Sequence, residues 1–174
     1  MKEIKKNRWL LLALLVLAVL FVSSSMTYRQ QTTVPLLERV LKNEPGLAWV
    51  SRIRINYGAG QIISVQTSSY FQVVEFIMRK LAHFGSYFLM GMFLFMYLDD
   101  HLQPRWLQFV LTPLAVGGLA ALDEWHQLFT GDRSPEVQDV ILDMSGALVA
   151  VILVTLWRWF ARRKKSRSVQ KDAR

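Results

Sequence analysis

The stretch that decides the fold is DEWHQLFTGDRSPEVQDVILD, residues 123 to 143. It contains six acidic residues, one histidine and one arginine, although apolar sequence lies on both sides of it. Thr130 and Gly131 are suited to ending one helix, and SPE at 134–136 is suited to starting the next with a cap, a proline and an acidic residue. The stretch therefore predicts a tight antiparallel hairpin of two helices, with Arg133 in the turn.

The chain contains four long apolar runs, at residues 9–22, 81–98, 106–122 and 140–160. A transmembrane helix needs about 20 mostly apolar residues, and each run is that long or nearly so. A soluble helical protein would show polar residues at a 3.6-residue period along these runs, whereas here polar positions are only scattered. The sequence therefore predicts an all-α membrane protein, a bundle of four transmembrane helices with an extracytoplasmic segment between the first and second helices.

The formal net charge of +8 is concentrated in two basic clusters, one before the first apolar run and one after the last. Basic residues beside membrane helices fit the positive-inside rule and anionic headgroups better than a nucleic-acid surface, so no nucleic-acid partner is expected. We therefore expect a multi-pass protein of the cell membrane with both termini in the cytoplasm. The clusters are Lys2, Lys5, Lys6 and Arg8, and Arg158, Arg162, Arg163, Lys164, Lys165, Arg167, Lys171 and Arg174.

This topology divides the chain into four segments. They are a cytoplasmic basic segment with the first helix (1–28), an extracytoplasmic segment (29–69), a three-helix core (70–157) and a basic cytoplasmic tail (158–174) that we expect to be disordered. The first apolar run followed by SSS at 23–25 also fits a secretory signal peptide, and its cleavage stays open as an alternative. The chain has no cysteine, so no disulfide braces the extracytoplasmic segment.

Short elements are predicted within the extracytoplasmic segment. VPLLERVL at 34–41 predicts a short amphipathic helix. RIRINYGAGQIISVQ at 52–66 alternates polar and apolar residues around a glycine-containing turn, which predicts a β-hairpin. Ser68 and Ser69 are suited to cap the helix that carries the second apolar run.

Polar and small side chains share faces on the third and fourth helices. Small residues three or four apart let helices approach closely in lipid. We expect the two small-residue stripes to pack together and to bring the acidic groups toward each other. The shared faces comprise Glu124, Gln127, Gly117 and Ala121 on the third helix, and Asp139, Asp143, Gly146 and Ala150 on the fourth.

The second helix supplies basic groups at the same depth. Arg79 and Lys80 lie at its outer end, His83 lies about one turn deeper, and Tyr87 and Gly91 continue that face. Charges in a membrane are costly unless they are paired or hydrated, so a shared pocket is the favourable arrangement. The sequence thus predicts an outward-facing polar pocket between three helices.

Several chemistries fit such a pocket, and the residues leave them open. A carboxylate beside a histidine can act as an acid–base pair, with Glu124 or His83 as the candidate catalytic base. His83 and His126 with the acids could bind a metal ion, but EWHQ lacks the spacing that puts two histidines on one helical face, so no metal and no cofactor are expected. The charges could instead form a structural ion-pair network without a ligand, and Asp123 and His126 could simply cap the helix end.

Three motifs follow one another in a specific order: RKLAHF at 79–84, LDEWHQLF at 122–129 and DRSPEVQDVILDMSGA at 132–147. Together they resemble the VanZ-like family of small bacterial membrane proteins, over about residues 70 to 154. The order and spacing of the three motifs carry this resemblance. The positions that match the family's motifs are Lys80, His83 and Phe84, then Asp123, Glu124, Gln127 and Phe129, then Arg133, Asp139, Asp143 and Gly146.

The resemblance implies a link to teicoplanin-class glycopeptide resistance and to the bacterial cell envelope. Our first hypothesis is a non-enzymatic protein whose pocket binds a lipid-linked ligand, such as a lipid-linked cell-wall precursor, a headgroup or the lipoglycopeptide itself. Arg79, Lys80 and Arg133 would meet its phosphate or carboxylate groups, and the acidic residues would meet its amine or hydroxyl groups. The expected ligand-binding residues are Arg79, Lys80, His83, Asp123, Glu124, Gln127, Arg133, Asp139 and Asp143.

The second hypothesis is an intramembrane enzyme that modifies an envelope lipid or wall polymer. Glu124 or His83 would act as its base, and Arg133 would stabilise developing negative charge. We favour binding, because the sequence shows no nucleophile motif and no enforced metal spacing. A transporter is less favoured, since four spans leave little room for alternating access. Membrane lipids are expected partners in each case, and the oligomeric state is left open.

Overall fold

The computed structural model describes residues 2–57, 60–129 and 136–172. Within these ranges, four helices are long and apolar enough to cross a membrane. Each contains one of the four apolar runs, so the predicted all-α bundle of four membrane helices is confirmed. The four are α1 (Lys2–Ser24), α5 (Tyr70–His101), α6 (Leu107–Gln127) and α7 (Val137–Asp172).

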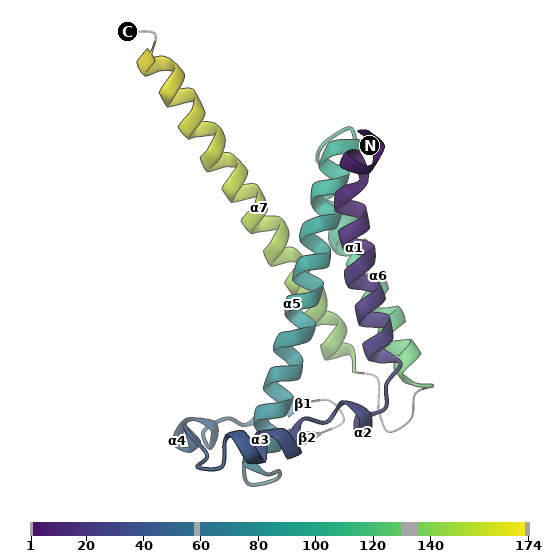
Figure 1. The fold of residues 1–174 in the computed structure, drawn as a ribbon, viewed down its shortest axis with the longest axis vertical. Coiled ribbons are helices and arrows are strands. Elements are labelled where there is room, and N and C mark those ends of the chain that lie inside the picture. Colours follow the sequence, from purple (N-terminus) through teal and green to yellow (C-terminus); the bar gives the residue numbers. More distant parts are fainter. Residues whose placement is uncertain (1, 58–59, 130–135, 173–174) are drawn as a thin grey trace.

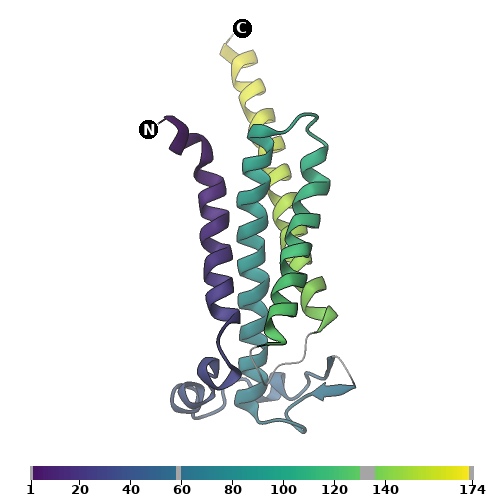
Figure 2. The same ribbon diagram turned by 90° about the vertical axis from the view of Figure 1, so that its right-hand side faces the viewer.

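The central helix is α5, which packs against α1, α6 and α7. The long helices alternate in direction, so the two termini lie at one end of the bundle and the short elements of residues 28–63 lie at the other (Figures 1 and 2). We call these the termini end and the loop end. The alternation gives four passes with both termini on one side, as the charge pattern predicts.

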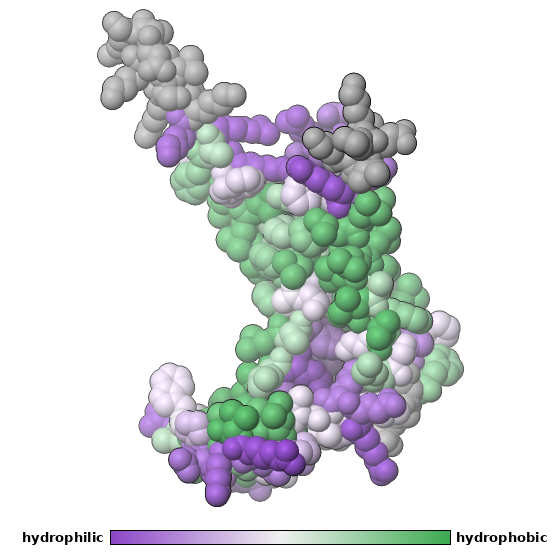
Figure 3. Space-filling view, viewed as in Figure 1, coloured by the Kyte–Doolittle hydropathy of each residue, from purple (hydrophilic) through white to green (hydrophobic). Residues whose placement is uncertain are grey.

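The face of the bundle drawn in Figure 3 is largely apolar between two polar ends. Large hydrophobic side chains are exposed on every long helix, for example Leu15 on α1, Leu89 on α5, Leu114 on α6 and Ile152 on α7. An apolar surface this extensive marks a membrane or protein interface, and lipid tails are as apolar as these side chains. The chain is therefore a membrane protein.

The buried core lies where the four long helices meet. Tyr87 of α5 is its largest member and is 1% exposed. Alanines of α6 and α7 pack around it and leave room for its ring. The core residues are Leu20, Tyr87, Met90, Val116, Ala120 and Ala147.

Small residues let α5 and α7 approach each other closely. A Cβ added at Gly146 on α7 would lie 2.6 Å from the Phe84 carbonyl oxygen, and one added at Gly91 on α5 would lie 2.7 Å from the Ala147 Cα. The predicted packing of the α7 stripe on the α6 stripe is therefore wrong at Gly146, which faces α5, and Ala121 of α6 is exposed. The reason is that α5 contributes its own glycine to the contact, so α7 approaches most closely there.

The short elements of the loop end are α2 (Tyr28–Gln31), α3 (Val34–Val40), α4 (Leu47–Val50), β1 (Ile55–Tyr57) and β2 (Gln61–Ile63). The two strands are antiparallel with Ile55 opposite Ile63, which confirms the predicted hairpin. The predicted short helix is α3, and Leu37 is its buried residue. Ser69 caps α5 as predicted, because its hydroxyl accepts a hydrogen bond of 3.2 Å from the backbone N–H of Gln72.

Two helix ends differ from their predictions. The last residue of α6 is Gln127, before the predicted end at 130–131, and both that pair and residues 134–135 lie outside the described residues. The final helix, α7, continues through the basic tail to Asp172, so the expected disorder of the tail is wrong. Lysine, arginine and glutamine are good helix formers, and a helix already formed in the membrane extends into them at little cost.

Candidate functional site

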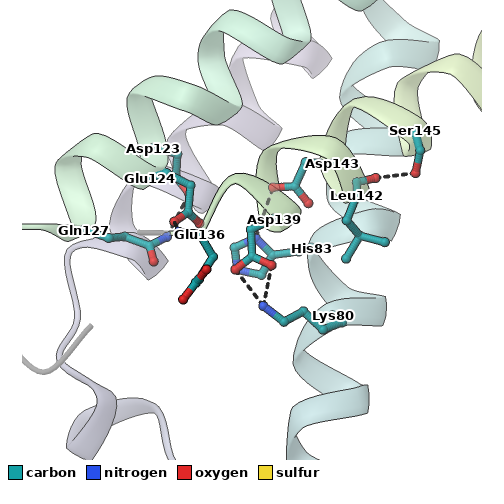
Figure 4. A network of polar contacts seen from close by, with 10 residues as sticks. All are labelled: Lys80, His83, Asp123, Glu124, Gln127, Glu136, Asp139, Leu142, Asp143 and Ser145. Carbon is teal, nitrogen blue, oxygen red and sulfur yellow. Dashed lines mark hydrogen bonds and ion pairs between the residues drawn. The ribbon is translucent and has the colours of Figure 1, made fainter. Parts of the chain in front are cut away.

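Two charge contacts join α5 to α7 near the loop end (Figure 4). Lys80 Nζ donates to both carboxylate oxygens of Asp139, at 2.5 and 2.6 Å. One turn farther along each helix, His83 Nδ1 lies 3.5 Å from Asp143 Oδ2. Residues three or four apart share a helix face, so the two contacts lie one above the other between the helices. We call the Lys80–Asp139 contact the outer rung and the His83–Asp143 contact the inner rung. We call these four residues the polar cluster.

The inner rung is more buried than the outer one and less satisfied. The Asp143 side chain is 2% exposed, whereas those of Lys80 and Asp139 are each 19% exposed. The inner separation of 3.5 Å exceeds a normal hydrogen bond. Among the described residues, His83 Nδ1 and Asp143 Oδ1 have no hydrogen-bond partner. A buried carboxylate costs several kcal/mol unless it is fully hydrogen-bonded, so Asp143 retains capacity for a donor from water or a ligand.

The polar cluster lies near one edge of the membrane-spanning part of α5. Between Lys80 and Asp99 the helix contains no Asp, Glu, Lys or Arg. This interval spans about 30 Å of helix, which is the thickness of the hydrocarbon core of a bilayer. Lys80 therefore lies at the edge of the hydrocarbon layer and His83 about one turn inside it.

Aromatic side chains cover Lys80 from the loop end. Its Nζ lies 4.3 Å from the ring centroid of Tyr57 in β1 and 5.1 Å from that of Phe76 in α5. Such contacts stabilise an ammonium group that has lost part of its hydration. Tyr57 also carries a buried hydroxyl without a hydrogen-bond partner in the described chain. Sequence reasoning missed Tyr57, because nothing in the hairpin pattern indicates which helix the hairpin covers.

Glu124 connects the end of α6 to the start of α7. Its Oε2 accepts a hydrogen bond of 3.0 Å from the backbone N–H of Glu136, one residue before α7 begins. A carboxylate at a helix N-terminus satisfies an unpaired donor and interacts favourably with the helix dipole. Glu124 is buried, so this position gives the residue a structural role beside any role in binding.

Asp123 borders an apolar cavity of about 480 Å³ between α1 and α6. Gln127 Nε2 donates to its Oδ2 at 3.1 Å. Tyr87 lines the same cavity, and its ring centroid lies 6.4 Å from that of His83. Tyr87 therefore connects the cavity to the polar cluster, although none of the four cluster residues lines the cavity itself. Its apolar walls include Leu14, Leu17, Phe21, Leu119 and Leu122.

The predicted basic trio is not gathered at the polar cluster. Arg79 turns toward α1 and α2, where its Nη2 lies 3.6 Å from Glu75 and its guanidinium lies 4.8 Å from the Tyr28 ring. Arg133 lies outside the described residues. Lys80 is thus the predicted basic residue that the structure brings to Asp139.

Glu75 is a buried acid that sequence reasoning missed. It accepts hydrogen bonds from the Tyr28 hydroxyl at 3.0 Å and from the backbone N–H of Thr33. With Arg79 it fixes the segment after α1 against α5. Its position inside the apolar stretch VVEFIM at 73–78 is the signal that would have found it, since ionisable residues in such stretches need partners.

His126 lies apart from the polar cluster. Its Nε2 lies 3.1 Å from the Ser25 hydroxyl, and its ring stacks on Phe21 of α1 at 5.0 Å. Over the described ranges, no three His, Cys, Asp or Glu side chains are grouped so that they could hold a metal ion. Hydrogen bonding, charge pairing and acid–base exchange are the chemistries that the gathered side chains can perform.

Comparison with known families matches residues 9–158 to the family described as VanZ/LLP1. The match covers most of the chain, including α1, and so extends beyond the region that carries the motifs. No curated protein and no solved structure matches the chain.

Proposed function

Because the chain belongs to the VanZ/LLP1 family, we propose that it is a bacterial cell-envelope protein that binds a lipid-linked ligand. Its site would be the polar cluster together with the adjacent apolar cavity. The phenotype that we propose is resistance to teicoplanin-class glycopeptides.

The observation that carries the proposal is the buried, incompletely hydrogen-bonded Asp143, which one aromatic ring, that of Tyr87, separates from an apolar cavity. One Asp143 oxygen has no hydrogen-bond partner among the described residues, and Tyr87 separates the His83–Asp143 contact from the cavity. A polar group next to an apolar hollow suits an amphiphile, whose headgroup fills the hydrogen bonds while its chain fills the hollow. A lipid-linked cell-wall precursor and a lipoglycopeptide both have this character.

The charges suggest which groups of the ligand bind where. Lys80 would donate to a phosphate or carboxylate, in competition with Asp139. Asp143 would accept from an amine or hydroxyl. Asp123, at the cavity border, would accept from a second such group. Binding would lower the access of the antibiotic to its target, and no covalent step is required.

The charges support an orientation of the protein in the membrane. Both basic clusters belong to the helices that end at the termini end, and by the positive-inside rule that end would lie in the cytoplasm. The loop end would then lie outside the cell membrane, where glycopeptides act. The polar cluster would face that side.

The test is glycopeptide susceptibility of a Gram-positive host that expresses the protein, its variants or nothing. Asp143→Asn and Asp139→Asn remove the two acidic charges of the polar cluster, and Asp100→Asn at the exposed termini end is the matched control. Teicoplanin and vancomycin are compared because vancomycin carries no acyl chain for the cavity. We expect protection against teicoplanin that the two site variants lose and the control keeps. Unchanged protection in both site variants, at equal membrane levels, would contradict the proposal.

A second candidate function rests on the His83–Asp143 contact. A histidine beside a buried carboxylate is the arrangement used for general acid–base catalysis. The chain would then be an intramembrane enzyme acting on an envelope lipid or wall polymer. Mass spectrometry of lipids and peptidoglycan from cells with the protein, without it, or with His83→Gln distinguishes the two functions. Identical envelope composition in all three would exclude the enzyme.

A further inference from the structure

A second polar site lies at the termini end of the bundle, at the opposite membrane edge from the polar cluster. There a cavity of about 230 Å³ opens between the end of α5, the start of α6 and α7. We call it the termini pocket. It is independent of the site proposed above, because the two share no residue. The residues that matter for its chemistry are Asp99, Arg105, Gln108, Arg158, Trp159 and Arg162.

Asp99 organises one wall of the termini pocket. Its Oδ2 accepts a charged hydrogen bond from Arg158 Nη1, and its Oδ1 accepts from Gln108 Nε2 at 2.8 Å. Both of its oxygens are therefore occupied. The Arg158 guanidinium has five donors, so it keeps donors for a second acceptor while Asp99 holds its orientation.

The pocket carries an excess of positive charge. Arg105 and Arg162 also line it, and both are exposed. Neither forms an ion pair with any residue that the structure describes. Three guanidinium groups thus surround one carboxylate, so the side chains that line the pocket have a net charge of about +2. This charge favours binding of an anion. Guanidinium forks match the oxygens of a phosphate group.

The depth of the pocket identifies the source of the phosphate. Asp99 ends the uncharged interval of α5, about one hydrocarbon thickness from Lys80. Trp106 and Trp159 are exposed at this level, and tryptophan is enriched at the headgroup layer. Lipid phosphates lie in this same layer, and basic pockets between membrane helices bind lipid headgroups.

We propose that the termini pocket binds the phosphate of an anionic phospholipid. Arg105, from the segment before α6, and Arg162, from α7, close on the phosphate oxygens from two sides. Arg158, held by Asp99, forms the floor. Trp159 packs against the glycerol and upper acyl region. The bound lipid links the segment before α6 to α7.

Native mass spectrometry of the detergent-solubilised full chain tests the proposal. It is titrated with phosphatidylglycerol, with phosphatidylcholine of the same acyl chains, and with glycerol phosphate as the free headgroup. We expect retention of phosphatidylglycerol over phosphatidylcholine. Arg105→Gln and Arg162→Gln should each weaken phosphatidylglycerol binding about fivefold.

Lys164→Gln is the matched control, since Lys164 is an exposed cation two residues after Arg162 and does not line the pocket. An equal loss in Lys164→Gln would show diffuse attraction to the basic tail and overturn the site. Equal binding of both lipids would overturn the preference for an anionic lipid. Binding of glycerol phosphate as tight as that of the lipid would assign the pocket to a soluble anion. Arg105 and Arg162 are both exposed, so we expect both variants to fold, and either one alone keeps the test decisive.

Discussion

His83 on α5 and Asp143 on α7 face each other across 3.5 Å at a depth where neither is fully hydrogen-bonded within the described chain. The outer rung, Lys80 with Asp139, is closer and more exposed. The two rungs therefore differ in kind. The outer one pairs its charges at short distance, and the inner one leaves one Asp143 oxygen without a hydrogen-bond partner in the described chain.

Replacing Asp143, the acid of the inner rung, should abolish function but leave stability nearly unchanged. Asp143→Asn keeps the shape of the side chain and removes a buried charge whose pairing is incomplete, so we expect the unfolding free energy to change by no more than about 1 kcal/mol. Resistance should nevertheless be lost. Thermal unfolding of the purified protein and drug susceptibility of the same strain check the two parts. A collapse of the fold would instead identify Asp143 as a structural residue.

The outer rung should behave as a structural ion pair. Lys80→Met leaves the Asp139 carboxylate without its partner, and we expect a loss of about 1–3 kcal/mol, because the pair is only partly exposed. Adding Asp139→Leu should restore most of that loss, since the double variant contains no unpaired charge. The measurement is a double-mutant cycle by thermal unfolding. Additive losses would mean that the two residues do not interact.

The close approach of α5 and α7 should depend on glycine. Gly146→Ala puts a methyl group 2.6 Å from a backbone oxygen of α5, and we expect a loss of about 1–3 kcal/mol. Gly118→Ala on α6 is the control, because a Cβ there meets nothing within 4 Å. Alanine favours helix over glycine, so the control should be neutral or stabilised by up to about 1 kcal/mol. Equal melting temperatures for the two variants would contradict the packing.

The proposed orientation can be checked with single cysteines, because the natural sequence has none. Trp49→Cys lies at the loop end, where the native side chain is 80% exposed, and Asp100→Cys lies at the termini end. A membrane-impermeant thiol reagent should label the first in intact cells and the second only after lysis. The reverse labelling pattern would mean that the loop end faces the cytoplasm.

The helix faces of the site and the helices that carry them could be predicted from the sequence, but the individual side-chain pairs could not. The spacing of Lys80 and His83, and that of Asp139 and Asp143, indicated two polar faces because helical periodicity is fixed. The structure packs α7 against both α5 and α6, and Gly91 with Gly146 lets α7 approach α5 most closely. A periodic pattern on one helix contains no information about the neighbour.

Arg79 illustrates the same limit at a single residue. It follows Met78 and precedes Lys80, so it points about 100° away from Lys80 around the helix. Its partner Glu75 lies one turn earlier on the same face of α5, and the ring of Tyr28 packs against that face. The sequence showed two adjacent basic residues. They have different partners because the segment after α1 packs beside Arg79 and not beside Lys80.

The most direct test of the central claim is photo-crosslinking from the apolar cavity in living cells. A photoreactive amino acid is introduced at Leu122, which lines the cavity, or at Leu114, an equally exposed residue of α6 that does not line it. Mass spectrometry then identifies the captured lipids. We predict that position 122 captures a distinct lipid-linked species, that position 114 captures bulk phospholipid, and that Asp143→Asn removes the first capture alone. The same lipids at both positions, unaffected by Asp143→Asn, would contradict a binding site formed by the polar cluster and the cavity.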